Sequence, residues 1–538
     1  MKRNICICLS LFLMCSTFAF AQGELDAYRY SQSDILGTAR SISMGGAFGA
    51  LGGDISSMWT NPAGLGVYHS SEIVTTLSFN NIYANSNWNG TKVNGDKNLR
   101  VNFDNIAYVG YYPTGNDEGL ISWNVGFAYN RMKNFYRNYR FNGHQSYSLA
   151  DYAAVKANGE GESNFSPLLS STTADDTYQQ LGGLWMPALA YQGGAIGAYL
   201  QGGDIYHSAF GQWSKDGNTF NFWSPDDVNL NVHERGYIDK YDFSFATNIS
   251  NTFFIGATLA VTDLYYKMNS KYDEYFGTGN DKDHLYLDNY KKTDGTGYSF
   301  NIGALIRPVD AFRFGVAYCS PTWYKLTDYY QGELGTSISL YDPSDMTGRT
   351  PDGVYTDYKL RSSDKWIFSA AAIIGTNALL SVDYELENFK NVKLSDRDDN
   401  DYADNDLISK DFGSSNTLKV GAEVKVTPQF SIRCGGSWRT SPLKDDFKNG
   451  KLEVYPSGTV PNYTLYKGTD TYSIGFGYRF TPHFYTDFAC VTSQYKEDAY
   501  AFPSASSTVN NTKYSVVCEP VSLKTNLTQI ALTFGYKF

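Results

Sequence analysis

The chain has 538 residues, a formal net charge of -11 at pH 7, and 44 Tyr, 33 Phe and 50 Gly. Such acidity argues against nucleic acid as a partner. The cysteines beyond residue 21 are widely spaced and form no C-x-x-C pair, which indicates neither a metal site nor a disulfide framework. They are Cys319, Cys434, Cys490 and Cys518. The sequence predicts no cofactor.

Residues 1–21 have the pattern of a secretory signal peptide. Lys2 and Arg3 give a positive start, an apolar run follows from Ile5 to Phe18, and Ala19-Phe20-Ala21 fits the small-x-small cleavage rule. Beyond this segment the sequence has no uninterrupted stretch of about 18 apolar residues. Any further membrane-spanning element must therefore be a strand.

Residues 22–69, which we call the hatch, precede the first predicted strand. Five glycines lie between Gly45 and Gly53, and glycine permits close backbone packing and positive φ. Interleaved apolar side chains such as Phe48 and Trp59 are too frequent for a solvated tail. We predict a folded plug rather than a flexible tail.

Segments of alternating polarity then recur to the end of the chain. Side chains alternate faces along a strand, so each segment predicts a β-strand. Fourteen segments fit, at about 70–84, 98–112, 119–133, 231–248, 250–267, 295–307, 311–325, 355–374, 376–391, 413–426, 428–441, 470–480, 483–496 and 526–538.

The connections between these segments alternate strictly between short and long. Short turns rich in Gly, Pro, Asn or Asp fall at 113–118, 248–251, 308–310, 375–377, 427–428 and 481–482. Long connections fall at about 85–97, 134–230, 268–294, 326–354, 392–412, 442–469 and 497–525. Outer-membrane barrels have short periplasmic turns and long extracellular loops.

The sequence therefore predicts an all-β fold, a transmembrane antiparallel β-barrel of about 14 strands over residues 70–538. We expect it in the outer membrane of a Gram-negative cell, in contact with outer-membrane lipid, with both termini periplasmic. A barrel of this size encloses a lumen, which the hatch is expected to fill.

The last predicted strand shows the two faces of the wall. One face carries the apolar side chains of Ile530, Leu532, Phe534, Tyr536 and Phe538. The other face carries the small or polar residues Gln529, Ala531, Thr533, Gly535 and Lys537. We expect the first face to contact lipid and the second to contact the hatch.

The connection 134–230 is unusually apolar for a segment facing water. Exposed apolar surface marks binding sites, which predicts capture of a hydrophobic ligand at the extracellular mouth. The alternative is that short helices fold against each other as a lid, and the sequence leaves both open. The candidate capture residues are Leu184, Trp185, Met186, Leu189 and Tyr191.

Charged residues at inward positions of several strands have mixed signs. Isolated charges in a narrow lumen are costly, so we expect ion pairs and hydrogen bonds to the hatch. A clamp for a substrate carboxylate is the alternative for the arginines, Arg307, Arg313, Arg433 and Arg439.

Two further groups of residues were considered as metal or haem ligands. The acidic segment 396–406 lacks the Gly and Glu that an EF-hand loop requires, so we interpret it as a solvated loop and predict no metal site. His207, His233 and His284 form no close pair or haem-attachment motif. Ser and His do not meet on one barrel face, and we predict no catalytic residues.

The chain resembles the FadL/TodX-type family of outer-membrane transporters for long-chain fatty acids and other hydrophobic compounds. The run from Ala39 to Ala47, which contains Met44, Gly45, Gly46 and Ala47, carries this resemblance together with Asn61, Pro62, Ala63 and the aromatic final strand. The resemblance implies a hatch that occludes a fourteen-stranded barrel, and a C-terminal strand recognised by the barrel-assembly machinery.

We expect passive transport of a hydrophobic small molecule, such as a long-chain fatty acid, through the hatch-gated barrel. Two alternatives remain: a receptor for a haemin-type ligand, and a non-transporting barrel that anchors or shuttles partner proteins in secretion.

Overall fold

The structure is a computed structural model that describes residues 23–35, 37–170, 172–199, 203–213, 220–277, 283–338, 346–509 and 511–538. The predicted signal peptide lies outside the described residues.

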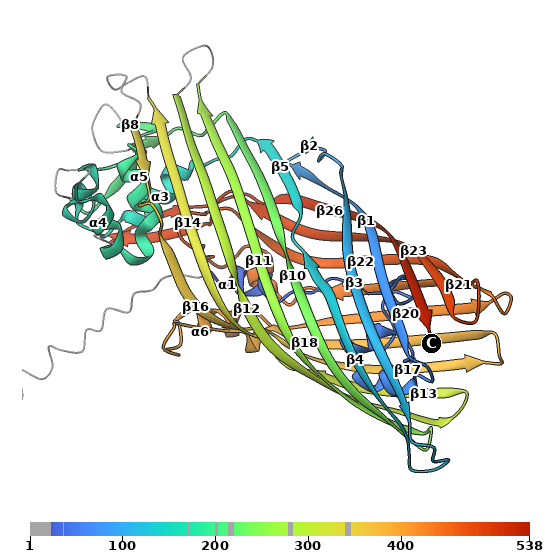
Figure 1. The fold of residues 1–538 in the computed structure, drawn as a ribbon. Helices are drawn as coiled ribbons and strands as arrows, with labels where there is room; N and C mark the ends of the chain where they lie inside the picture. Colours follow the sequence, from blue (N-terminus) through green and yellow to red (C-terminus); the bar gives the residue numbers. More distant parts are fainter. Residues whose placement is uncertain are drawn as a thin grey trace, which may run out of the picture.

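The chain forms a closed antiparallel barrel of fourteen strands, which confirms the predicted fold class (Figure 1). Four wall strands are interrupted and carry two labels. The wall consists of β1 (Glu72–Trp88), β3 (Asn98–Pro113), β4 (Leu120–Asn134) with β5 (Arg137–Gly143), β10 (Asp227–Ile249), β11 (Phe253–Phe276), β12 (Asp283–Val309), β13 (Phe312–Cys319) with β14 (Trp323–Ser337), β16 (Tyr355–Arg361) with β17 (Asp364–Ile374), β18 (Ala378–Asn388) with β19 (Lys393–Ser395), β20 (Ser414–Lys425), β21 (Phe430–Thr440), β22 (Tyr463–Arg479), β23 (Phe484–Tyr500) and β26 (Val521–Lys537). β1 pairs with β26 and closes the barrel.

Several strands run further than the sequence predicted. The segment 268–294 was expected to be a long connection, but β11 and β12 pair continuously as far as Phe276 opposite Asp283. The outward side chains of β11 are apolar up to Val261 and polar from Asp263 onward. A strand that projects above the lipid has no apolar outer face, so its alternation is weak and was missed.

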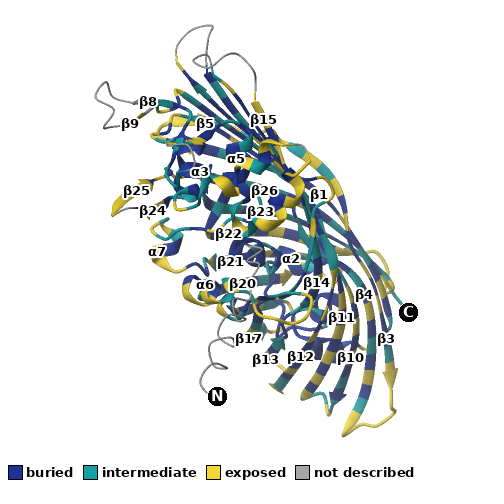
Figure 2. Cartoon of the chain, turned by 90° about the vertical axis from the view of Figure 1, so that its left-hand side faces the viewer, coloured by how far each residue is buried: buried dark blue, intermediate teal, exposed yellow. Residues whose placement is uncertain are grey.

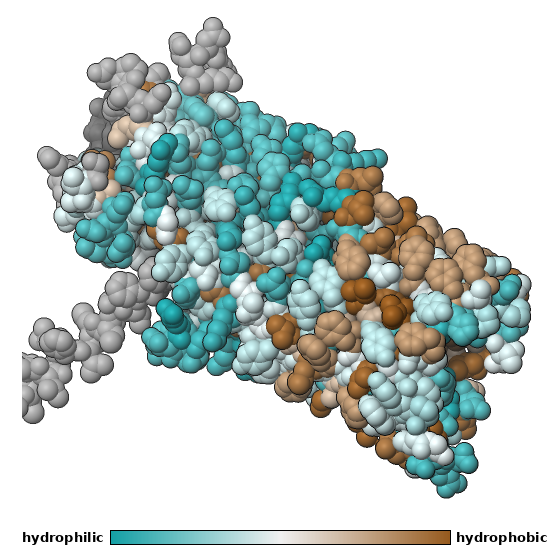
Figure 3. Space-filling view, viewed as in Figure 1, coloured by the Kyte–Doolittle hydropathy of each residue, from teal (hydrophilic) through white to brown (hydrophobic). Residues whose placement is uncertain are grey.

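The apolar outer surface forms a band near the short turns. Exposed side chains of β11 such as Phe253, Ile255 and Leu259 contribute to it. Figure 3 shows the apolar surface concentrated toward this end, whereas the opposite end is hydrophilic. Figure 2 shows the matching alternation of exposed and buried residues along β3, β10 and β11. None of the described helices is long and apolar enough to cross a membrane.

The hatch lies inside the barrel and consists of α1 (Glu24–Tyr30), α2 (Ala39–Ser43), η1 (Ile55–Met58) and η2 (Pro62–Val67). Its backbone is held by the wall: Ala39 N donates to Thr533 Oγ1 at 2.7 Å, and Phe48 N and Gly49 N both donate to Asp383 Oδ2 at 2.9 Å. The predicted plug inside the lumen is therefore present.

The two ends of the described chain lie at opposite ends of the barrel. Gly23 packs against Tyr455 in the long connection between β21 and β22, whereas Phe538 N donates to Ser71 O beside the short turns. The expectation that the chain begins and ends on one side is wrong for these residues. The reason is that the hatch traverses the lumen from the long-connection end before β1 begins.

The remaining elements gather at the long-connection end, where Figures 1 and 2 show α3 and α5 lying across the barrel. They are β2 (Thr91–Val93), α3 (Leu149–Ala157), η3 (Glu162–Asn164), η4 (Ser166–Leu169), α4 (Ala174–Gln180), η5 (Gly182–Leu184), α5 (Trp185–Gln192), β6 (Ile196–Ala198), β7 (Tyr206–Ser208), β8 (Gly211–Trp213), β9 (Phe220–Phe222), β15 (Met346–Arg349), η6 (Phe389–Asn391), α6 (Asp404–Asp411), α7 (Asp445–Lys448), β24 (Ala505–Val509) and β25 (Thr512–Val516).

Candidate functional site

The glycine-rich motif of the hatch allows very close contact with the wall. Gly45 and Gly46 have φ of 65° and 75°, which side chains other than glycine rarely adopt. A Cβ on Gly45 would lie 2.7 Å from the Gly436 backbone, and Met44 lies against Gly421 and Gly435. The motif Met44 to Ala47 thus packs backbone to backbone against β20 and β21.

The Asn-Pro-Ala motif ties two parts of the hatch to the wall. Asn61 Nδ2 donates to Gly49 O at 2.8 Å and to Ala304 O at 3.2 Å, while Asn61 Oδ1 accepts from Ala63 N at 3.2 Å. Pro62 starts η2, where its fixed φ suits a helical turn. These contacts suit a hatch that holds one defined position.

Three of the four predicted lumen arginines, Arg433, Arg313 and Arg439, contact partners inside the barrel. Arg433 pairs with Asp487 at 2.6 Å and with Glu423, which also pairs with Arg40 of the hatch at 3.0 Å. Arg313 donates to the hatch carbonyl of Leu51. The expected ion pairs and hydrogen bonds to the hatch are therefore present.

Arg439 and Arg307 complete the set. Arg439 donates to Ser33 O of the hatch at 2.9 Å and pairs with Glu387. Arg307 lies 3.9 Å from Asp310 at a short turn, away from the hatch contacts. A carboxylate clamp formed by these arginines stays an untested prediction.

A buried cation that the sequence analysis missed anchors α1. Lys291 is 1% exposed and contacts Asp26 of α1, Asp328 of β14 and the Ser457 hydroxyl. Lys291 falls within the predicted connection 268–294, whereas in the structure it lies on the extended part of β12. The alternation of the residues around it, which places Lys291 on the inner face of the strand, was the available sequence signal.

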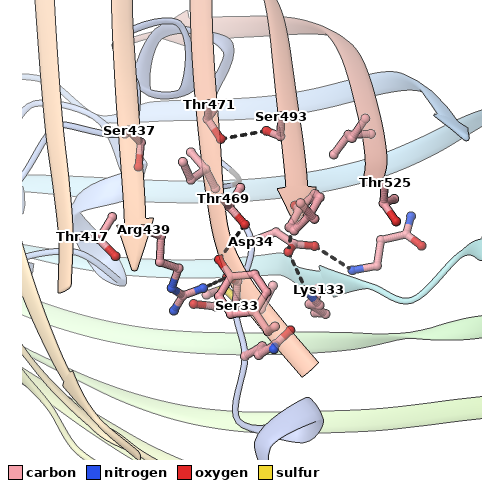
Figure 4. A pocket seen from close by; sticks show the side chains of 18 of the residues that line it. Ser33, Asp34, Lys133, Thr417, Ser437, Arg439, Thr469, Thr471, Ser493 and Thr525 are labelled. Carbon is pink, nitrogen blue, oxygen red and sulfur yellow. Dashed lines mark hydrogen bonds and ion pairs between the residues drawn. The ribbon is translucent and has the colours of Figure 1, made fainter. Parts of the chain in front are cut away.

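A cavity of about 210 Å³ lies between the hatch and the wall. Hatch residues 32–35 border it on one side, and strands β20 to β26 border it on the other (Figure 4). Asp34 projects into this space and pairs with Lys133 at 2.7 Å. The kinked stretch 132–137 at the junction of β4 and β5 completes the lining.

The wall has a break beside this cavity, between β3 and β4. Their pairing runs from Pro113 opposite Ser122 only as far as Asn105 opposite Asn130. The preceding part of β3, from Asn98 to Phe103, pairs with β1 alone. β5 instead packs against inward side chains of β1, since Phe141 contacts Trp88 at 5.3 Å between ring centroids.

A glycine on the neighbouring strand permits this displacement. β10 pairs with β4 up to Tyr237 and with β5 from Glu234, and Gly236 between them has φ of 135°. A Cβ at this position would lie 2.0 Å from Tyr265 O, so only glycine fits. An isolated Gly inside a strand pattern often marks such a bulge, and this was the available sequence signal.

Side chains, and not backbone hydrogen bonds, bridge the break. The Arg100 guanidinium lies 3.8 Å from the Tyr136 ring centroid, and Asn134 Nδ2 donates to Asn102 Oδ1 at 3.4 Å. The hatch replaces part of the missing ladder, because Asp34 N donates to Met132 O at 3.0 Å. Break, hatch and cavity therefore meet at one place.

The candidate capture residues do not form an exposed surface. Trp185, Met186, Leu189 and Tyr191 are buried and Leu184 is partly buried. The capture hypothesis expected these side chains to be exposed, and that expectation is wrong. The short helices pack against each other, and Trp185 contacts Tyr178 at 5.5 Å between ring centroids. The short helices therefore pack against each other as the lid alternative expects, and ligand capture by these residues stays an untested prediction.

The residues considered for metal or haem lie at the long-connection end. Asp396 Oδ1 accepts from the backbone of Asp398 and Asn400, both at 2.8 Å, in a local turn. His284 contacts Asp273 at 3.2 Å, and His233 contacts Asn138 at 3.0 Å. Among the described residues, His, Cys, Asp and Glu form no group of three placed to hold a metal ion.

The sequence from residue 246 to residue 538 matches the profile of one family, described as outer membrane protein transport protein (OMPP1/FadL/TodX). The chain belongs to this family. The family assignment agrees with the resemblance in the hatch and final strand, and it places the barrel in the outer membrane. The matched region starts within β10 and continues through β26, so the hatch and the broken seam precede it.

The chain is also similar in fold to several solved structures. A FadL homologue from Pseudomonas aeruginosa is 11% identical with a TM-score of 0.49, covering 94% of this chain and 99% of that one. The toluene transporter TodX from P. putida is 10% identical with a TM-score of 0.47, at 94% and 99% coverage. The CymD monoaromatic hydrocarbon channel is 12% identical with a TM-score of 0.45, at 94% and 98%. No curated protein matches the sequence.

Proposed function

We propose that this protein passes hydrophobic small molecules passively across the outer membrane, through the lumen cavity and out by the break between β3 and β4. The observation that carries the proposal is the junction at residues 132–137, which both lines the cavity and lacks a backbone ladder to β3. At this junction, a solute in the cavity is separated from the outside by side chains and not by a continuous hydrogen-bonded sheet.

The outer rim of the break suits a hydrophobic solute. Leu99 and Val101, on the part of β3 that has no partner in β4, are 73% and 66% exposed on the outer side, and Phe103 is 41% exposed. Backbone N–H and C=O groups without hydrogen-bond partners are costly in contact with lipid. A break that is kept despite this cost favours a functional role for it. Leaving through this rim would keep an apolar molecule out of water.

The hatch is placed to control this route. Residues 33–35 lie in the cavity lining, and the Asp34 backbone and side chain hold Met132 and Lys133 at the break. Displacement of this segment would remove both contacts at once. We therefore assign the hatch the role of a gate and the lid at the long-connection end the role of an entrance.

The test is uptake of labelled toluene, long-chain fatty acid and long-chain fatty alcohol by cells with and without the gene. We expect uptake of at least one of these solutes to fall several-fold in the deletion strain and to return with the cloned gene. Unchanged uptake together with altered release of surface proteins would overturn the proposal in favour of a barrel that anchors or shuttles partners.

A further inference from the structure

One side of the lumen cavity is a row of hydroxyl groups on adjacent strands. Ser437 of β21 lies opposite Thr471 of β22, which lies opposite Ser493 of β23. The Thr471 and Ser493 hydroxyls share a hydrogen bond of 2.9 Å (Figure 4). Thr417, Thr469 and Thr525 line the same cavity one row further. Hydroxyl groups both donate and accept hydrogen bonds, so this wall can donate a hydrogen bond to a polar group of a ligand or accept one from it.

The adjoining part of the cavity is apolar. Ile82 of β1 and Leu527 of β26 are register partners, and both line the cavity together with Val491. Ile35 of the hatch and Met132 of β4 line the side at the break. The cavity therefore presents a polar wall and an apolar wall to one bound molecule.

The charges that line the cavity already pair with one another. Each of the six lining cations has a carboxylate within 4.0 Å: Arg29 with Asp26, Lys133 with Asp34, Arg137 with Glu234, Lys365 and Lys419 with Glu385, and Arg439 with Glu387. A ligand carboxylate would have to displace one of these partners, and the displaced carboxylate would remain buried. A neutral polar group requires no such exchange.

Two buried polar groups of the lining lack a partner within the described chain. Asn80 Oδ1 and Thr525 Oγ1 make no hydrogen bond, although both residues are only 5% exposed. A buried polar group without a partner costs free energy, which a hydroxyl or amide on a ligand would recover. Both residues lie on β1 and β26, where the polar and apolar walls meet.

We propose that the cavity selects neutral amphiphiles, with an apolar body and an uncharged hydroxyl or amide group, over pure hydrocarbons and over carboxylates. This proposal rests on the proposed passage through the lumen, because it names the class of molecule that passes. The polar group would lie against Ser437, Thr471 and Ser493, and the apolar body against Ile82 and Leu527.

The test compares three probes with ten carbons: 1-decanol, decanoate at pH 8 and n-decane. Binding to the full chain in lipid nanodiscs is measured by equilibrium dialysis, with empty nanodiscs as the blank. We expect decanol to bind at least tenfold more tightly than either other probe. Equal or tighter binding of decanoate or decane would overturn the proposal.

A double variant, Thr471→Val with Ser493→Ala, removes two hydroxyls at nearly constant volume. We expect about tenfold weaker binding of decanol and unchanged binding of decane. The matched control is Thr492→Val, which removes an exposed hydroxyl on the outer face of the same strand. Heat-modifiable mobility on gels establishes that each variant folds. An unchanged decanol affinity in the double variant would overturn the proposal.

Uptake separates the two proposals. If cells take up hydrophobic solutes through this protein but decanol has no preference in binding, the selectivity is wrong and the passage stands. If no solute is taken up, the passage is wrong, whatever the cavity binds.

Discussion

Two seams of the barrel wall differ in how completely their strands pair. At the seam between β1 and β26, every residue from Glu72 to Asn87 has a partner on the opposite strand. At the seam between β3 and β4, pairing stops at Asn105 opposite Asn130, and side chains bridge what remains. The first seam joins the two ends of the sheet, and yet the second is the weaker.

The difference shows that the weak point of this wall is built by partners distant in sequence. Gly236 on β10 lets β5 move inward, and Asp34 of the hatch takes up the free edge of β4 at Met132. The closing seam needs no such support because its strands keep one register throughout. The completely paired seam closes the barrel, and the proposed passage lies at the incompletely paired one.

Removing residues 23–66 should have the largest effect, because the hatch occupies the lumen beside both seams. We expect a folded barrel whose ion conductance in planar bilayers rises at least tenfold, since a fourteen-stranded wall encloses more space than its own side chains fill. The intact chain is the control. A conductance that does not rise would show that the hatch is not what closes the barrel.

Linking the broken seam should abolish most uptake. Cysteines at Asn102 and Asn134, whose side chains contact each other, would be oxidised to a disulfide in a background with the four cysteines beyond residue 21 replaced by Ala. We expect at least a tenfold loss of hydrophobic solute uptake that reverses on reduction.

The matched control for this link is on the fully paired seam. Phe79 and Ile530 are register partners with exposed side chains on the outer face of β1 and β26. Cysteines there should leave uptake unchanged in both redox states. Equal loss in the control, or no loss in the linked break, would mean that passage does not use the β3–β4 seam.

Gly236→Ala should destabilise the barrel by forcing the kink to change. The added Cβ would meet Tyr265 O, and φ of 135° is strained for alanine, so we expect a loss of about 1–3 kcal/mol in the free energy of unfolding. Urea unfolding in lipid measures this loss. Gly197→Ala is the control, because its Cβ would have no atom within 4 Å. Similar losses in both variants would refute a special role for the kink.

The smallest effect concerns pH at the far end of the hatch. Burial raises the pKa of Glu24 to about 8, helped by the nearby Asp411 and Asp404 carboxylates. Glu24 stays protonated in the folded chain while it ionises in a detached one, so attachment of α1 is complete at low pH and weakens as pH rises toward 8.

Hydrogen exchange of residues 24–30 reports this attachment. We expect exchange to increase from pH 5.5 to pH 8.5 beyond the intrinsic dependence of the amide, by up to several-fold. Glu24→Gln should remove the additional increase, whereas Asp176→Asn, an exposed site on α4, should keep it. The same additional increase in Glu24→Gln would exclude Glu24 as its source.

Sequence patterns located the wall strands but misjudged their lengths. Within the membrane the contrast between apolar and polar faces is strong, as at Ile530 and Gln529, which are 40% and 2% exposed. Above the membrane the outer face of a strand is polar and the inner face is mixed, as around Lys291, so the periodicity loses its contrast. The candidate capture residues illustrate a related difficulty: an apolar run predicts burial or binding equally, and only the packing shows that these side chains are buried.

Residue patterns alone predict the barrel, its fourteen strands, the alternation of its loops and a hatch with charged partners. Those features follow from local periodicity and turn chemistry, which neighbouring residues specify. Three other features appear only in the folded chain: the hatch crosses the lumen from the long-connection end, the seam between β3 and β4 is broken, and hydroxyls line one wall of the cavity. These depend on contacts between residues far apart in the chain, such as Asp34 with Lys133, and on a register that sets which side chains share a row.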